Sequence, residues 1–159
     1  MDVVSVPATW QAMLVRLILA TAVGAVVGVN REFRQKPAGL RTHALVALGS
    51  ALLAMIGLAL SEQGVVHDAS ATSRILQGIV AGVGFIGGGA ILRQDDAKGV
   101  HGLSTAASIW IVAATGIAAG CGLWRASIAT ALLALAILAL GAPADRALRS
   151  LHTHTDDPD

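Results

Sequence analysis

The stretch GVNREFRQKPAGLRTHALV, Gly28 to Val46, places four cations between two long runs of residues that carry almost no charge. Such a block is typical of a loop that joins two membrane helices on the cytoplasmic side, where lysine and arginine are retained. Only 13% of the residues are charged and the mean hydropathy is +0.70, values that exclude the charged shell of a soluble protein of this size. We therefore predict an all-α, polytopic membrane protein.

Five apolar runs have about the length of a membrane-spanning helix, which needs about 20 mainly apolar residues. The predicted spans are Trp10–Val29, His43–Leu60, Ile75–Leu92, Leu103–Ala119 and Leu123–Gly141. A signal peptide begins with basic residues, and Met1 to Pro7 holds none. The first run is therefore interpreted as a span. Residues 1–142 are thus predicted to form one transmembrane domain, and residues 143–159 a short, disordered cytoplasmic tail.

The distribution of lysine and arginine predicts the orientation, because positive charge marks the cytoplasmic side. Three arginines lie at one set of span ends, namely Arg16, Arg74 and Arg125. Eight cations lie in the first loop, the third loop or the tail, namely Arg31, Arg34, Lys36, Arg41, Arg93, Lys98, Arg146 and Arg149. The N-terminus is therefore expected outside and the C-terminus in the cytoplasm. Trp10 and Trp124 then both lie at the outer interface, where tryptophan is enriched.

Small residues recur at helical spacing within the spans, a pattern that lets helices approach closely in lipid. Helix packing is predicted for Gly24, Gly28, Gly78, Gly82, Gly84, Gly87 and Gly88. The GxGxxG within this set lies inside an apolar run, so a nucleotide site is not predicted. The run Gly87 to Gly89 has two interpretations: a close backbone contact, which we favour, or local unwinding as in transporter sites.

Polar residues also recur in rows within the spans. His43, Ala47 and Ser50 share one side of the second span, and Ser104 and Ser108 share one side of the fourth. Tight helix contacts are favoured over a lined pathway as the explanation of these rows.

An internal similarity relates the two predicted cytoplasmic loops. The segment Gly39 to Ala44, GLRTHA, matches Gly102 to Ala107, GLSTAA, and the same offset places Gly24 on Gly87. The interpretations are two parallel two-helix repeats plus one helix, or coincidence in a chain rich in Ala, Gly and Leu. The hydroxyls in these segments are expected to cap the helices that follow.

Three blocks resemble the MgtC/SapB family of bacterial inner-membrane proteins: REFRQKPAGLRTHALVALGS, GVGFIGGGAILR and GVHGLSTAASIW. The resemblance implies a five-helix domain in the inner (plasma) membrane, linked to magnesium homeostasis and adaptation to low magnesium. In some pathogens, members of this family are linked to intracellular survival and to modulation of the ATP synthase, so the resemblance implies these roles as well. It concerns the membrane domain, since the chain ends at Asp159 without the soluble domain of better-known members. Asn30 stands where many relatives carry an acid, so no carboxylate role is carried over there.

The polar residues offer no nucleophile with its base and no closed ligand set, so neither an enzyme nor a cofactor is predicted. Glu32, Asp95 and Asp96 are weak candidates for a magnesium site, because magnesium takes one or two carboxylates. Ion pairing with the lysines and arginines beside them is the favoured interpretation.

The loop residues form a second candidate set, for interaction with other proteins: Asn30, Arg31, Arg34, Gly39, Leu40, Arg41, Thr42, Gly102, Leu103 and Thr105. Its three arginines are interpreted as a functional cluster or, preferably, as anchors at the lipid headgroups. Arg16 is expected to extend outward rather than face an interior with Thr21 and Gln77.

Two function classes remain. The first is a non-catalytic regulator in the bilayer that contacts other inner-membrane proteins, the ATP synthase by resemblance, or a second copy of itself. The second is a small transporter or channel for magnesium or another cation, which should bury an ionisable residue at mid-membrane. Well inside spans two to four, away from their ends, the polar residues are Gln77, Ser50, Ser108 and Thr115, none of them ionisable, which favours the regulator. No basic face with interleaved aromatics exists, so no nucleic-acid partner is predicted.

Overall fold

The computed structural model describes residues 4–7, 9–62, 69–92 and 101–152. They form five helices, α1 (Trp10–Phe33), α2 (Leu40–Glu62), α3 (Ala69–Leu92), α4 (Leu103–Gly120) and α5 (Trp124–His152), and no strand. Each helix is long and apolar enough to cross a membrane. The predicted all-α, five-span architecture is confirmed, while its orientation stays a prediction.

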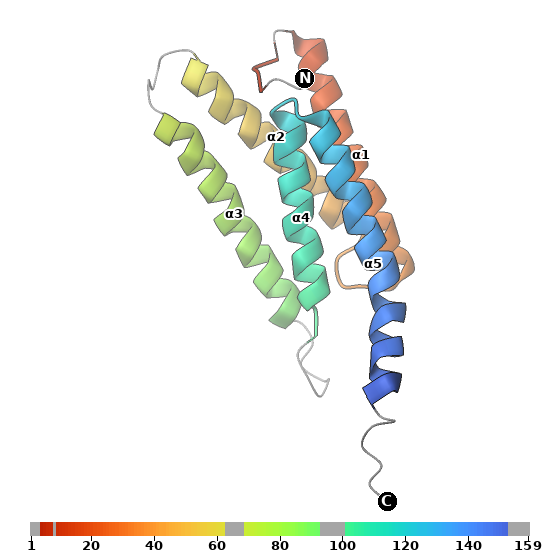
Figure 1. Cartoon of the computed structure of the whole chain (residues 1–159). Helices are drawn as coiled ribbons and strands as arrows, with labels where there is room; N and C mark the ends of the chain where they lie inside the picture. The colour runs from red at the N-terminus through yellow and green to blue at the C-terminus, as the bar shows by residue number, and fades with distance from the viewer. Residues whose placement is uncertain (1–3, 8, 63–68, 93–100, 153–159) are drawn as a thin grey trace, which may run out of the picture.

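Helix α4 lies at the centre of the bundle, with α3 on one side and α1 and α5 on the other (Figure 1). Half of its membrane-spanning residues are buried, compared with 17% for α3 and for α5. It also packs along α2, so it contacts all four other helices. The polar side chains that α4 carries are therefore placed between helices rather than in lipid.

Glycines on α1 and α4 allow both helices to approach the backbone of α2. A Cβ atom at Gly24 would lie 2.5 Å from the carbonyl oxygen of His43, and one at Gly28 would lie 2.6 Å from the Cα of Leu40. On α4, a Cβ at Gly120 would lie 2.4 Å from a carbonyl oxygen of α2. Any side chain at these positions would separate the helices, so glycine is required by packing.

The glycines of α3 differ from the prediction. A Cβ at four of them would meet no described atom within 4 Å: Gly78, Gly82, Gly84 and Gly88. Their predicted packing between helices of one chain is therefore wrong for the described residues. Gly87 alone of the predicted α3 set approaches a neighbour, with its Cβ position 3.4 Å from the Cβ of Ala106. Local unwinding is also wrong, since α3 is an uninterrupted α-helix to Leu92.

The contacts between helices repeat at the offset seen in the sequence. Adding 63 to the pair Gly24 and His43 gives Gly87 and Ala106, and both pairs lie in contact. Likewise, Gly28 approaches the backbone of Gly39, and Ile91 approaches Gly102. The helix pairs α1–α2 and α3–α4 thus use equivalent positions, which supports a repeat rather than coincidence.

The C-terminal segment is more ordered than predicted. Helix α5 continues to His152, so the prediction of a disordered tail is wrong for residues 143–152, and the rest lies outside the described residues. The composition of this part, with alanine, leucine and arginine, favours helix. Pro143 lies within the helix and lacks the N–H that would bond to the carbonyl of Ala139.

Candidate functional site

A buried polar cluster joins α1, α2 and α4 near the end of the bundle that holds the first loop. Its charged member is Arg31, which is only 2% exposed. The Nη2 of Arg31 donates to Thr105 Oγ1 at 2.9 Å and to Ser104 Oγ at 3.3 Å. Arg31 is therefore a link between the first and fourth helices.

His43 is the second buried member, with no exposed surface. Its Nδ1 lies 2.8 Å from the carbonyl oxygen of Gly39, and its Nε2 lies 3.0 Å from Ser108 Oγ. The carbonyl can only accept, so Nδ1 carries a proton and donates to it. The Ser108 hydroxyl donates its single proton to the carbonyl of Thr105 at 2.8 Å, so the same proton is not available to Nε2; the hydroxyl connects the histidine to the arginine cluster.

Two buried polar atoms of the cluster region have no hydrogen-bond partner. They are Arg31 Nε and Asn30 Oδ1. Native proteins pair nearly all buried polar atoms, so each such atom marks a strained or functional position. The hydrogen bonds of Arg31 to described side chains use Nη2 alone, which leaves donors on its other nitrogens.

Glu32 has a structural role at the start of α2. Its Oε2 accepts from the backbone N–H of Leu40 at 2.9 Å, so this carboxylate caps the first turn of α2. A Cβ at Gly39 would collide with the same carboxylate, which explains a glycine before the helix. No group of three His, Cys, Asp or Glu side chains that could hold a metal occurs in the described ranges. The candidates Asp95 and Asp96 lie outside those ranges.

The other arginines of the first loop lie at the surface. Arg34 Nη2 donates to the carbonyl of Ala139 at 3.3 Å, the carbonyl that the proline at 143 cannot satisfy. Arg41, Thr42 and the side chain of Leu40 are exposed or half-buried. The three arginines are therefore not one cluster: one is buried, one binds α5, and Arg41 is exposed.

The expected capping hydroxyls act differently. Helix α4 begins after Gly102, whose φ of 86° is left-handed, and no side chain caps it. The hydroxyls of Ser104 and Thr105 accept from Arg31 instead, and Leu103 is 59% exposed. The hydroxyls at the start of α4 thus form a contact with α1 rather than a helix cap.

The opposite end of the bundle is held by Arg16. Its Nη1 donates to the carbonyls of Ser5 and Gly120, the latter at 2.9 Å, and its Nη2 donates to Ser5 Oγ at 3.0 Å. The outward course predicted for Arg16 agrees with these partners. Next to it, burial raises the pKa of the Cys121 thiol, and the Arg16 charge partly opposes that rise.

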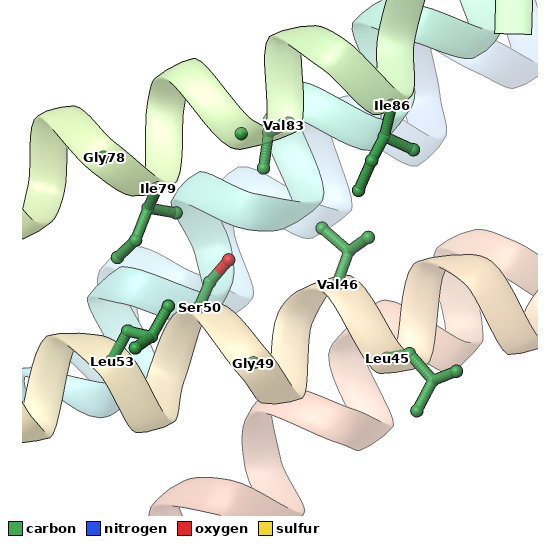
Figure 2. A pocket seen from close by; sticks show the side chains of 10 residues that line it. Leu45, Val46, Gly49, Ser50, Leu53, Gly78, Ile79, Val83 and Ile86 are labelled. Atoms are coloured by element: carbon green, nitrogen blue, oxygen red, sulfur yellow. The ribbon is translucent and has the colours of Figure 1, made fainter. Parts of the chain in front are cut away.

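An apolar groove of about 400 Å³ separates α2 from α3 (Figure 2). Figure 2 shows Val46, Ser50 and Leu53 of α2 facing Ile79 and Val83 of α3. The groove is open because the α3 glycines that line it have no side chains. Its lining holds no charged residue, and its polar side chain is that of Ser50.

Comparison with known proteins places most of the chain in one family. The family model described as the MgtC family matches residues 17–147, which include every residue of the buried cluster. The chain belongs to the MgtC family. No solved structure matches this MgtC-family chain.

Three relatives show how similar this MgtC-family chain is to known proteins. It is 45% identical over 132 residues to Protein SrpB of Synechococcus elongatus, covering 79% of this chain and 72% of that protein. It is 40% identical over 131 residues to the putative magnesium transporter YhiD of Escherichia coli K12, covering 79% and 58%. It is 36% identical over 122 residues to Protein MgtC of Salmonella typhimurium LT2, covering 77% and 49%. The chain thus spans about half the length of the last two relatives.

Sequence reasoning missed the buried cluster, although a pattern for it exists. Arg31 follows Gly24 by seven residues and Gly28 by three, so it continues the packed stripe of α1. His43 and Ser108 each belong to a row for which helix packing was favoured over a lined pathway. A polar residue at the end of such a row is the observation that could have indicated the cluster.

Proposed function

We propose that this MgtC-family chain is a non-catalytic membrane protein that supports growth when magnesium is scarce, and that it acts by contacting other membrane proteins. The names of two relatives, MgtC and putative magnesium transporter YhiD, support the link to magnesium. The proposal concerns the membrane domain alone, because the chain spans 58% and 49% of those proteins.

The positive charge of the buried cluster is the observation that favours a regulator over a transporter. A path for Mg²⁺ needs oxygen ligands, one or two of them carboxylates. The ionisable side chains buried between the described helices are Arg31 and His43, and the carboxylate of Glu32 is exposed and caps α2. A fixed guanidinium repels a divalent cation, so this cluster is suited to hold helices together.

The contact surface that we propose is the exposed first loop, at the predicted cytoplasmic end. Arg41 is exposed and lies outside the buried cluster, so a partner can reach it. Arg74 on α3 is also exposed and lies at the opposite end in the predicted topology, which makes it a matched control.

Growth and ion flux test this proposal separately. A strain that lacks the protein should grow poorly at low magnesium and normally at high magnesium. Arg41→Glu should fail to restore growth, whereas Arg74→Glu should restore it. The purified protein in proteoliposomes should move no magnesium. Robust magnesium-dependent flux, or full restoration by Arg41→Glu, would overturn the regulator and favour the transporter.

A further inference from the structure

A second recess at the first-loop end is lined by cations rather than by apolar residues alone. It has a volume of about 380 Å³ and lies among the ends of α1, α4 and α5. Arg31, Arg34 and Lys36 line it together with the Ser104 hydroxyl, and Ile137, Leu138 and Gly141 form its apolar part. Its volume falls in the range of ligand-binding pockets.

No carboxylate among the described residues neutralises the cations of this recess. None of the three forms an ion pair with a described residue; Arg31 bonds to two hydroxyls and Arg34 to a carbonyl. Arg31 is 2% exposed and keeps its Nε without a partner. Three cations that line one recess favour an anionic ligand, and guanidinium groups match the geometry of phosphate oxygens.

The apolar part of the recess indicates which anion. Ile137 is 70% exposed, so a ligand beside the cations also has a hydrocarbon surface to cover. The site lies at the end of the membrane-spanning helices, where lipid headgroups meet acyl chains. In the predicted topology this is the cytoplasmic leaflet, whose anionic lipids are attracted to basic residues beside helix ends.

We propose that this recess binds the phosphate of an anionic phospholipid, with Arg31, Arg34 and Lys36 as phosphate donors and α5 as the support for an acyl chain. The Ser104 hydroxyl, which accepts from Arg31 at 3.3 Å, keeps its own proton to donate to a phosphate oxygen. Lipid occupancy then ties α5 to the central helices. This inference does not depend on the proposed role in magnesium limitation.

The test measures lipid binding to the purified protein in a neutral detergent, by native mass spectrometry with phosphatidylglycerol and with phosphatidylcholine. Phosphatidylglycerol should bind with at least about tenfold preference, because its headgroup is net negative, whereas the choline cation of phosphatidylcholine offsets the phosphate charge and is repelled by the cations of the recess. Arg34→Gln with Lys36→Gln should remove that preference. Arg41→Gln with Arg74→Gln removes the same charge from surfaces outside the recess, and it should leave the preference unchanged.

A competition experiment distinguishes a lipid site from a site for a soluble anion. Inorganic phosphate at millimolar concentration should not displace phosphatidylglycerol, and displacement would assign the recess to a soluble anion instead. Equal weakening by the two double variants, or no preference between the lipids, would overturn the proposal. If the first double variant loses its thermal transition, Lys36→Gln alone replaces it, because Arg34 then keeps its bond to α5.

Discussion

Substitution of Gly24 by alanine should force α1 away from α2. The added Cβ would lie 2.5 Å from the carbonyl oxygen of His43 and 2.7 Å from the Cβ of Ala47. Ordinary van der Waals contact begins at 3.4 Å, so the helices must separate by several tenths of an ångström or more. Because this is a backbone contact, no rotation of a side chain can relieve it.

The loss in the free energy of unfolding follows from the overpacking of the α1–α2 interface. Inserting one methyl group into a tight contact typically costs about 1–3 kcal/mol. Ala20 and Val27, which are fully buried beside this contact, would also lose packing. A loss of about 2 kcal/mol corresponds to a melting temperature lower by about 4–8 °C for a chain of this size.

The assay is thermal unfolding of the detergent-solubilised protein, with Gly84→Ala as the matched control. Gly84 also lies in a membrane-spanning helix, but a Cβ there would meet nothing within 4 Å. This control should therefore unfold at the same temperature or higher, since alanine favours helix by about 1 kcal/mol. An unchanged melting temperature for Gly24→Ala, or an equal drop for both variants, would refute the assignment of the α1–α2 contact.

Three further outcomes are expected. His43→Ala should lower stability by about 2–4 kcal/mol in the same assay, because it opens a cavity and removes the side-chain hydrogen bonds to Gly39 and Ser108; a loss under about 1 kcal/mol would contradict this. Gly102→Ala should unfold at a lower temperature than Gly49→Ala, since only the first has a φ of 86° and would place a Cβ 2.5 Å from a carbonyl oxygen. Cys121 should react with an impermeant thiol reagent from outside the cell, slowly at pH 7 and about tenfold faster per pH unit, because its raised pKa keeps the thiolate scarce. Labelling that needs permeabilised cells would contradict the predicted orientation.

Hydropathy was sufficient to predict the helices, because lipid requires long apolar segments whose backbone bonds are internal. Every predicted span overlaps the observed helix, and the largest error is α5, which continues past Gly141 to His152. Helix ends were less predictable, because they depend on local contacts such as the Glu32 carboxylate on α2.

The buried cluster was harder to predict because identical residue types in one loop have different environments. Arg31 and Arg34 are three residues apart, yet the first is buried and the second is exposed. Their difference depends on the continuation of α1 to Phe33, four residues beyond the predicted end at Val29. That continuation keeps Arg31 on the packed face. The helical spacing of the sequence predicts that Arg31 lies on the same side of α1 as Gly24 and Gly28, but it does not predict where the helix ends.

The repeat in the bundle has a consequence for how the two halves depend on each other. At the offset of 63, the counterpart of Arg31 is Gln94, and the counterpart of Thr105 is Thr42. The first half thus contributes the cation and the second half contributes the hydroxyls, although each half carries a hydroxyl at that position. The halves have diverged from equivalent units into complementary ones: the second half has no arginine at the position equivalent to Arg31, so two copies of that half would lack the cation of this contact.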